Sequence, residues 1–344
     1  MKNENQLISI VVPVFNRVGL IAETLNSVVD QTYLNWECII IDDGSSDGTQ
    51  DSIAEFLKNE ARFRFIQRDR EPKGAPTCRN IGVERALGDY IIFLDSDDLL
   101  VNTCLENRME IAHTFPENDF WVFRTALFSN RPGDSPKKWN VLNKEMDDLQ
   151  RFILIDIPWQ TTGTFWRKRV IQGLGGFDEN SICWQDWELH IRAIIGNLKY
   201  WKSSDNQSDS YYRMNKCNNW DSISTHHNEL SHILFRVELF NKFFLKVTSK
   251  DHRKEVKEAF SVLFYRLFME LYNHGEKKHL VNLHNSLVKL KIFSPLQLIV
   301  LRLLTINLNS KRGQVLLFRV VFKFLCFLNK DRFQNKSWMT FHSE

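Results

Sequence analysis

The sequence has few cysteines and no long apolar run, and these absences exclude several classes of protein. Six of the 344 residues are cysteine, none of them in a Cys-x-x-Cys pair, which indicates reduced thiols in a cytosolic protein rather than a disulfide framework. The two most apolar segments, residues 294–307 and 313–330, do not reach 18 residues without a charge, so no membrane-spanning helix is predicted. The first residues, MKNENQ, are polar, and no secretory segment is expected there.

Charge is distributed unevenly along the chain. Residues 1–240 carry a net charge of −9, whereas residues 241–344 carry +12, within a total of +3. Such asymmetry predicts different partners for the two parts. An acidic region can hold a metal ion, and a basic region can face anionic lipid or another polyanion. We expect no nucleic-acid partner, because no zinc-finger spacing and no aromatic RNA-binding pattern accompany the basic residues.

Strand and helix patterns alternate through the first half of the chain. Apolar segments predict buried strands at 8–15 and 36–43, and further strands are predicted at 62–69 and 89–98. Helical patterns lie between them, at 46–59 and 74–87 among others. This alternation predicts an α/β fold with a mostly parallel sheet. From about residue 226 the pattern is helical only, so we predict two domains, residues 1–225 and 226–344.

Adjacent carboxylates follow two of the predicted strands. Asp42 and Asp43 end the second strand, and Asp95, Asp97 and Asp98 end the fourth. Ligands of parallel sheets bind at the carboxyl ends of the strands, so both clusters are expected at one edge. Alternate carboxylates there suit a hard cation such as Mg²⁺. The structural alternative is that these residues cap the helices that follow them, with Ser46 or Asp47 as the cap at the first turn.

Four sequence blocks together resemble a known family. They are ISIVVPVFNR, QTYLNWECIIIDDGSSDGT, KGAPTCRNIGVERALGDYIIFLDSDD and LGGFDENSICWQDWELHIR, in that order. At these spacings they resemble the inverting, nucleotide-sugar-dependent glycosyltransferases of family 2, which have the GT-A fold. The resemblance covers residues 7 to about 225 and leaves the C-terminal third uncovered. It implies a Rossmann-like sheet flanked by helices, with an all-helical C-terminal extension.

The same resemblance implies a role for individual residues. Asp97 would ligate Mg²⁺ or Mn²⁺, and Asp186 would be the general base. The residues expected to contact the nucleotide are Pro13, Phe15 and Asp43 at the base, Arg79, Asp95 at the ribose, and Asp97 through the metal. No enzyme nucleophile is needed, which agrees with the absence of a Ser-His-Asp or Cys-His signature.

This chain departs from the family pattern at two places. The family usually has Glu-Asp where this chain has Gln185 and Asp186, so the base is retained but its neighbour is neutral. A His often follows the family's Tyr-Arg pair and completes the metal site, but Asn215 lies near that position here. The third metal ligand is therefore left open between water and Asn215.

Tryptophans cluster around the predicted base, and sugars present apolar faces that suit aromatic rings. Trp184 and Trp159 are the candidates for an acceptor site. The alternative is that these rings belong to the core, where tryptophan is usually largely buried. The core is the favoured location for Trp166 and Trp187.

The resemblance and the composition together predict an enzyme of cell-surface polysaccharide biosynthesis. The donor would be a UDP-sugar and the acceptor a glycan or a lipid-linked glycan. The basic C-terminal helices would lie on anionic lipid at the inner face of the plasma membrane. Their alternatives are a soluble bundle and a homodimer interface. Two other functions remain open: a non-catalytic nucleotide-sugar-binding module, and a sugar nucleotidyltransferase, which the absence of a Gly-rich phosphate loop after the first strand opposes.

Overall fold

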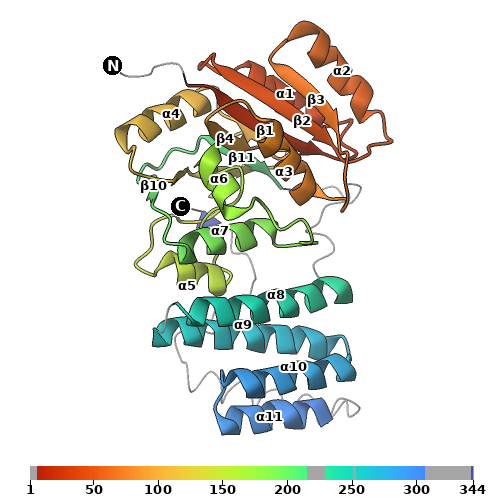
Figure 1. The fold of residues 1–344 in the computed structure, drawn as a ribbon, viewed down its shortest axis with the longest axis vertical. Coiled ribbons are helices and arrows are strands. Elements are labelled where there is room, and N and C mark those ends of the chain that lie inside the picture. The colour runs from red at the N-terminus through yellow and green to blue at the C-terminus, as the bar shows by residue number, and fades with distance from the viewer. Residues whose placement is uncertain (1–5, 215–228, 251–252, 307–341, 344) are drawn as a thin grey trace. The chain divides into compact units, whose positions relative to one another are not determined.

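The computed structural model describes residues 6–214, 229–250, 253–306 and 342–343. It divides into two compact units, which are described separately (Figure 1). One unit contains residues 1–145, 157–220 and 341–344, and the other contains 146–156 and 221–340. The predicted domain boundary at 225 lies outside the described residues. Residues 146–156, which the sequence places in the first domain, group with the C-terminal helices.

The first unit is built on a seven-stranded sheet. Its strand order is β10-β6-β9-β4-β1-β2-β3. The strands are β1 (Ile8–Val14), β2 (Trp36–Asp42), β3 (Phe63–Gln67), β4 (Tyr90–Phe93), β6 (Phe120–Val122), β9 (Thr164–Arg167) and β10 (Tyr200–Lys202). The pairs β1–β2, β1–β4 and β2–β3 are parallel, and β9 runs antiparallel to both of its neighbours. The mostly parallel sheet predicted from the sequence is therefore confirmed.

Helices cover both faces of this sheet (Figure 1). Ile10 and Val12 of β1 join one core cluster with Leu25 of α1 (Ile21–Val29), since alternate residues of a strand face the same side. Val11 faces the other side, where α3 (Ala75–Arg85) packs. A Cβ at Gly82 of α3 would lie 2.3 Å from the Val11 side chain, so only glycine permits this close packing.

A second sheet brings distant segments beside the carboxylates. Its order is β12-β8-β7-β11-β5. The strands are β5 (Leu99–Leu100), β7 (Thr125–Phe128), β8 (Lys137–Lys138), β11 (Ser210–Arg213) and β12 (His342–Ser343). Strand β11 pairs with β5, which directly follows Asp98, and with β7. The chain around residue 210 therefore lies next to the turn that carries Asp95, Asp97 and Asp98.

The remaining helices of this unit mostly match the predicted segments. They are α2 (Thr49–Asn59), α4 (Cys104–Thr114), α6 (Lys168–Leu174) and α7 (Gln185–Ile195). Helix α2 begins at Thr49 rather than at 46, because Gly48 adopts a left-handed conformation (φ 92°) that ends the preceding turn. The N-cap is Gly48, so neither Ser46 nor Asp47 caps the helix as predicted, although Asp47 Oδ1 accepts the Thr49 backbone N–H at 3.0 Å.

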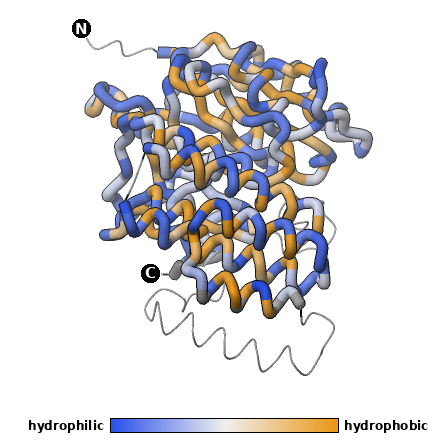
Figure 2. The backbone as a smooth tube through the Cα atoms, turned by 60° about the horizontal axis from the view of Figure 1, so that its bottom comes forward, coloured by the Kyte–Doolittle hydropathy of each residue, from blue (hydrophilic) through white to orange (hydrophobic). Residues whose placement is uncertain are grey.

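The second unit is helical throughout its described residues. It contains α5 (Asp148–Ile153), α8 (Leu230–Thr248), α9 (Lys254–Asn273), α10 (Lys277–Leu290) and α11 (Pro295–Ile306). Helix α9 packs against α5, α8 and α10, and α10 packs against α11. Hydrophobic and hydrophilic residues alternate along these helices (Figure 2), which is the amphipathic pattern that the sequence predicts. Phe244 of α8 packs edge-on against Phe260 of α9, with ring centroids 5.2 Å apart.

Membrane crossing was also tested on the described helices. None of them combines the length and the apolar character that a membrane span requires. The predicted helical segment 313–330 lies outside the described residues.

Candidate functional site

The turn after β2 gives its two adjacent aspartates different surroundings. Asp42 is fully buried, and both of its carboxylate oxygens are engaged within the turn. Oδ1 accepts the Ser45 backbone N–H at 3.2 Å, and Oδ2 accepts Gln50 Nε2 at 2.8 Å. Asp42 therefore shapes the strand–turn–helix junction, as the structural alternative proposes for this turn.

Asp43 points instead toward the segment before α3. Its Oδ1 accepts Arg68 Nε at 2.6 Å and the Gly74 backbone N–H at 3.2 Å. In the same loop, Lys73 Nζ lies 3.6 Å from the centroid of the Phe15 ring, a cation–π contact. Asp43 and Phe15, both expected at the nucleotide base, thus contact neighbouring residues of one loop. Pro13 is buried in β1, beside Ile41 of β2.

The turn after β4 holds three carboxylates within four residues. Asp98 is 1% exposed, and both of its oxygens are engaged: Oδ1 accepts the Arg213 backbone N–H at 3.0 Å, and Oδ2 accepts Thr162 Oγ1 at 3.1 Å. Asp98 therefore fastens β11 to this turn. Asp95 is partly exposed and accepts Arg79 Nη2 through Oδ1 at 2.6 Å. The strand itself ends at Phe93, so all three carboxylates lie in the turn rather than in the strand.

Asp97 lies between two arginines that the sequence did not single out. Arg17 Nε is 3.9 Å from Asp97 Oδ2, and Arg213 Nε donates to the Asp97 backbone carbonyl at 2.9 Å. Burial raises the pKa of Asp97, and Asp95 adds to the rise, whereas Arg17 and Arg213 oppose it. A cation beside Asp97 would favour its charged form.

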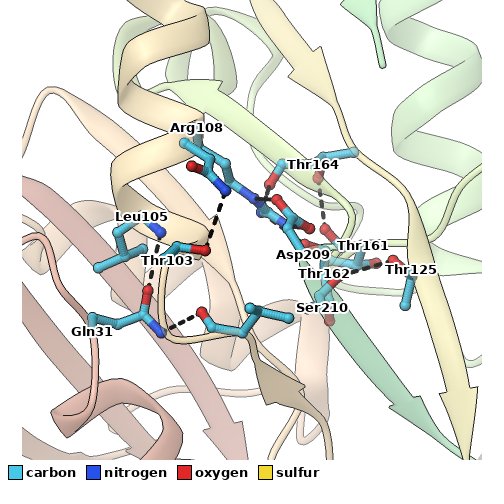
Figure 3. A network of polar contacts seen from close by, with 12 residues as sticks. Gln31, Thr103, Leu105, Arg108, Thr125, Thr161, Thr162, Thr164, Asp209 and Ser210 are labelled. Carbon is cyan, nitrogen blue, oxygen red and sulfur yellow. Dashed lines mark hydrogen bonds and ion pairs between the residues drawn. The ribbon is translucent and has the colours of Figure 1, made fainter. Parts of the chain in front are cut away.

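Figure 3 shows a buried polar network around Arg108 that includes Thr162, a partner of Asp98. Arg108 of α4 is fully buried and forms two parallel hydrogen bonds with Asp209, at 2.7 Å and 2.8 Å. Its Nη1 also donates to the backbone carbonyls of Thr162 and Thr164. Thr162 in turn donates to Asp98, so α4, the loop before β9 and the start of β11 hold the acidic turn in place.

Helix α7 brings the predicted base to the same edge of the sheet. Gln185 and Asp186 are its first two residues, and Gln185 Oε1 accepts Arg79 Nη1 at 2.8 Å. Arg79, which is 6% exposed, thus joins Asp95 of one turn to Gln185 beside Asp186. The structure therefore brings together three residues that are far apart in the sequence.

Asp186 is held in surroundings that favour proton uptake. Burial raises the pKa of Asp186, and Asp95 adds to the rise, while the Trp187 amide and Arg79 oppose it. The hydroxyl of Tyr212 on β11 faces the same group of carboxylates. Burial raises the pKa of Tyr212 well above its usual range, and the charges of Asp98, Asp97, Asp95 and Asp186 add to this. Tyr212 therefore stays a neutral hydroxyl.

The tryptophans near the predicted base fall into two groups, those buried in the core and one that is partly exposed. Trp159 is 1% exposed and packs against Phe120 and Tyr200, so its place in an acceptor site is wrong: the ring belongs to the core. Trp166 and Trp187 are likewise buried, as favoured from the sequence. Trp184 is partly exposed and precedes α7 with φ 59°, two residues before Asp186.

Arg17, Arg213 and Tyr212 are the members of this site that sequence reasoning missed. Arg17 follows the first strand, and the other two end the segment SYYR, but no spacing in the chain links either position to Asp97. Pairing of β11 with β5 brings Tyr212 and Arg213 there, and strand pairing across more than 100 residues leaves no local signal. The only sequence signal for Tyr212 and Arg213 was the Tyr-Arg pair of the family pattern.

The residues present were also tested for a metal site. No group of three or more His, Cys, Asp or Glu side chains that could hold a metal occurs in the described part of the chain. Asp97 offers one partly exposed carboxylate, and Mg²⁺ typically takes one or two carboxylates together with substrate phosphates. A site of that kind fits these residues. Asn215, His226 and His227 lie outside the described residues.

Comparison with known proteins shows which family the chain resembles. Residues 9–173 match the model of glycosyl transferase family 2. In that region the chain is similar to family 2 glycosyltransferases. A protein of Bacillus subtilis assigned as a teichuronic acid biosynthesis glycosyltransferase is 40% identical over 129 residues, 38% of this chain and 47% of its own length.

A second relative of this family 2 region comes from Escherichia coli. It is the UDP-Glc:alpha-D-GlcNAc-diphosphoundecaprenol beta-1,3-glucosyltransferase, 36% identical over 120 residues, 35% of this chain and 46% of its own length. The chain therefore spans somewhat less than half the length of these two curated relatives.

The fold has a solved counterpart over nearly the whole chain. The crystal structure of S. aureus TarS 1-349 in complex with UDP-GlcNAc aligns with a TM-score of 0.65. It covers 98% of this chain and 99% of that chain at 16% sequence identity. At that identity the likeness establishes the fold, and it confirms the predicted GT-A architecture with C-terminal helices.

Proposed function

We propose that this protein transfers a sugar from a nucleotide-sugar donor to a hydroxyl group of an acceptor, with inversion at the anomeric carbon. The observation that carries the proposal is the position of Arg79, which bonds Asp95 on one side and Gln185, next to Asp186, on the other. A single buried guanidinium thus connects the carboxylate turn after β4 to the residue beside a second, separate carboxylate. The match of residues 9–173 to the model of glycosyl transferase family 2 supports the same activity.

The donor would lie along the edge formed by the two carboxylate turns. Asp43, Phe15 and Pro13 would border the base, and Asp95 would contact the ribose. Arg79 would lie near the nucleotide, since its guanidinium already holds Asp95. The UDP-GlcNAc bound in the TarS structure and the UDP-Glc in the name of the E. coli relative support a UDP-sugar donor.

Asp97 would hold Mg²⁺ or Mn²⁺ in the working enzyme. The bound metal would offset the negative charge that develops on the leaving diphosphate. Arg17 and Arg213 place two further positive charges beside Asp97. The remaining places around the cation would be filled by phosphate oxygens and water, or by Asn215.

Asp186 would take the proton of the acceptor hydroxyl as that hydroxyl attacks the anomeric carbon. Such general-base assistance contributes roughly 10²–10⁴-fold to the rate. Its raised pKa suits this role, because a base is most effective when its pKa lies closer to the working pH. Attack opposite the leaving diphosphate gives inversion without an enzyme nucleophile. Trp184, two residues before this base, is the remaining candidate for contact with an acceptor sugar.

The acceptor we propose is a glycan or a lipid-linked glycan of a cell-surface polysaccharide. The teichuronic acid assignment of one relative and the diphosphoundecaprenol in the name of the other support this class. We place the protein in the cytoplasm, with its basic helices on anionic lipid at the inner face of the plasma membrane. Lys277, Lys278 and Lys289 of α10 are exposed and would make that contact.

The membrane contact has its own test. Sedimentation with vesicles of phosphatidylglycerol is expected to carry the protein down at low salt and less so at high salt. Vesicles of phosphatidylcholine serve as the uncharged control. Equal sedimentation with both would contradict an electrostatic contact, and a concentration-dependent dimer without vesicle binding would favour the homodimer interface.

The decisive experiment for the enzyme is titration calorimetry of UDP, GDP and CDP, each with Mn²⁺ and with EDTA. We expect UDP to bind in the presence of Mn²⁺ and to bind more weakly with EDTA. Release of UDP from a UDP-sugar then separates an active enzyme from a non-catalytic binding module, which would bind UDP without cleaving the donor. Pyrophosphate release from UTP and a sugar phosphate would indicate the nucleotidyltransferase alternative instead.

A further inference from the structure

Gln185 is anchored on both ends of its side-chain amide. Its Oε1 accepts Arg79 Nη1 at 2.8 Å, and its Nε2 donates to the Ser181 backbone carbonyl at 3.3 Å. The side chain is 8% exposed, so solvent cannot replace these partners easily. Because Gln185 is the first residue of α7, its two bonds fix the beginning of the helix that carries Asp186.

Arg79 is shared between Gln185 and a charged group. Its Nη2 donates to Asp95 Oδ1 at 2.6 Å, which makes the chain of contacts Asp95–Arg79–Gln185. A glutamate at position 185 has the same length and could accept the same bond from Arg79. Geometry alone therefore does not require glutamine. The difference is charge: with glutamate, one guanidinium would face three carboxylates, at positions 95, 185 and 186.

The charged and titratable groups around Asp186 come from three elements besides α7. Arg79 on α3 favours the ionised carboxylate, and Asp95, in the turn after β4, disfavours it. Tyr212 on β11 is neutral and adds no charge. Arg79 is thus the one cation among these named groups, and a further anion beside it would weaken its effect on Asp186.

We propose that Gln185 is a positioning residue for the base: it anchors the start of α7 to Arg79 without adding a third carboxylate to that arginine. This inference rests on the proposed function, in which Asp186 must be ionised to accept a proton. The neutral amide supplies the hydrogen bond, and the charge of Arg79 remains available to Asp95 and Asp186. Gln185 itself touches neither substrate nor metal in this assignment.

Two substitutions at position 185 test the hydrogen bond to Arg79 and the absence of charge separately. Gln185→Glu keeps the acceptor for Arg79 and adds the charge, whereas Gln185→Leu removes the acceptor and adds none. The probe is release of UDP from UDP-glucose and from UDP-N-acetylglucosamine with water as acceptor, measured from pH 4.5 to 9. The matched control is Gln172→Glu, which adds the same charge at an exposed position of α6.

The proposal predicts a different signature for each variant. In Gln185→Glu the acid limb of the kcat profile should move to higher pH by about one unit, because a like charge disfavours ionised Asp186. In Gln185→Leu kcat should fall on the order of tenfold to a hundredfold across the profile, with the KM for the donor within about threefold, because the base is misplaced. Gln172→Glu should match the wild type.

Several results would overturn the assignment. An acid limb of Gln185→Glu that coincides with the wild type removes the electrostatic role, and a wild-type kcat for Gln185→Leu removes the anchoring role. If Gln185→Leu fails to fold, as judged by its thermal unfolding, the isosteric Gln185→Glu still decides. If the wild type binds UDP but cleaves neither donor, the proposed function itself fails and the role of Gln185 with it.

Discussion

The turns after β2 and β4 each carry more than one aspartate, and the carboxylates within a turn differ in how fully they are hydrogen-bonded. In each turn one aspartate has both carboxylate oxygens engaged within the fold: Asp42 by Ser45 and Gln50, and Asp98 by Arg213 and Thr162. These two residues are buried almost completely. The neighbouring aspartates, in contrast, are held through one oxygen or by a longer ion pair. A run of acidic residues at the end of a strand therefore contains members that the fold engages fully and members that it leaves less engaged.

The two turns differ in what balances their charge. Asp43 meets Arg68 of the adjacent chain segment, only 25 residues away. The turn after β4 gathers three carboxylates. Arg79 of α3 is only 16 residues from Asp95, but Arg17 and Arg213 lie 80 and 116 residues from Asp97. The first turn is thus completed locally, whereas the second depends on the assembly of the whole unit. This difference indicates that the second turn is the more sensitive to distant substitutions.

The largest expected effect tests whether the two turns bind the nucleotide while Asp186 of α7 serves the reaction. Asp186→Asn should reduce kcat by roughly 10²–10⁴-fold, since an amide cannot accept the acceptor proton. UDP affinity should stay within about threefold, because Asp186 does not belong to either turn. UDP release assays and calorimetry on the same preparation measure both quantities. A comparable loss of UDP affinity would contradict the division.

The next prediction tests the distant support of the second turn. Arg108→Leu leaves Asp209 buried without its partner and should lower the free energy of unfolding by about 3–5 kcal/mol. Urea denaturation measures this change. Arg85→Leu is the control, since Arg85 is about half exposed in its ion pair with Asp69 and should contribute less than about 1 kcal/mol. Equal effects of the two variants would mean that the buried network does not support the turn.

A third prediction concerns Asp97 in the second turn. Asp97→Ala should weaken UDP binding in Mn²⁺ on the order of a hundredfold, so that binding in Mn²⁺ approaches binding in EDTA. Thermal unfolding should change little, because the closest cation to its carboxylate in an ion pair, Arg17, lies 3.9 Å away. Calorimetry with both additives checks the result. An unchanged response to Mn²⁺ would place the metal elsewhere.

The smallest effects come from exchanging the members of the first turn. Asp42→Asn should cost about 1–3 kcal/mol of stability, because one of its oxygens becomes a donor that faces donors. Asp43→Asn should weaken UDP binding about tenfold, which corresponds to about 1.4 kcal/mol. Unfolding curves and UDP titrations of both variants form the test. If Asp42→Asn bound UDP more weakly than Asp43→Asn, the assignment of Asp42 to stability and Asp43 to UDP binding would be contradicted.

The sequence predicted the sheet for a local reason. The segments ISIVVPV and WECIIID are mostly apolar and rich in β-branched residues, which is typical of strands buried on both faces. The helical pattern at 74–87 predicted α3, which packs on the sheet. The beginning of α2 was missed by three residues, because Gly48 adopts a backbone conformation that propensity does not indicate.

The candidate site was predictable only in part. Asp97, Arg79 and Asp186 came from the family resemblance, and the structure brings Arg79 to both Asp95 and Gln185. The structure corrected Trp159, since proximity to Asp186 in the sequence did not predict that its ring faces the core. Whether a carboxylate such as Asp42 or Asp43 serves the fold or a ligand was not readable either, because both follow the same strand and differ only in the partners that other segments provide.

The sequence by itself determined the α/β class, the two acidic strand ends and the helical nature of the described residues between 229 and 306, because each of these follows from residue types within a few turns of chain. Only the tertiary structure decided that Arg17 and Arg213 flank Asp97, that Arg108 supports the turn through Thr162, and that Gln185 bonds Arg79. These contacts join residues 54 to 116 positions apart. Hydrogen bonds across such separations depend on the packing of whole elements, and no short segment of the chain encodes them.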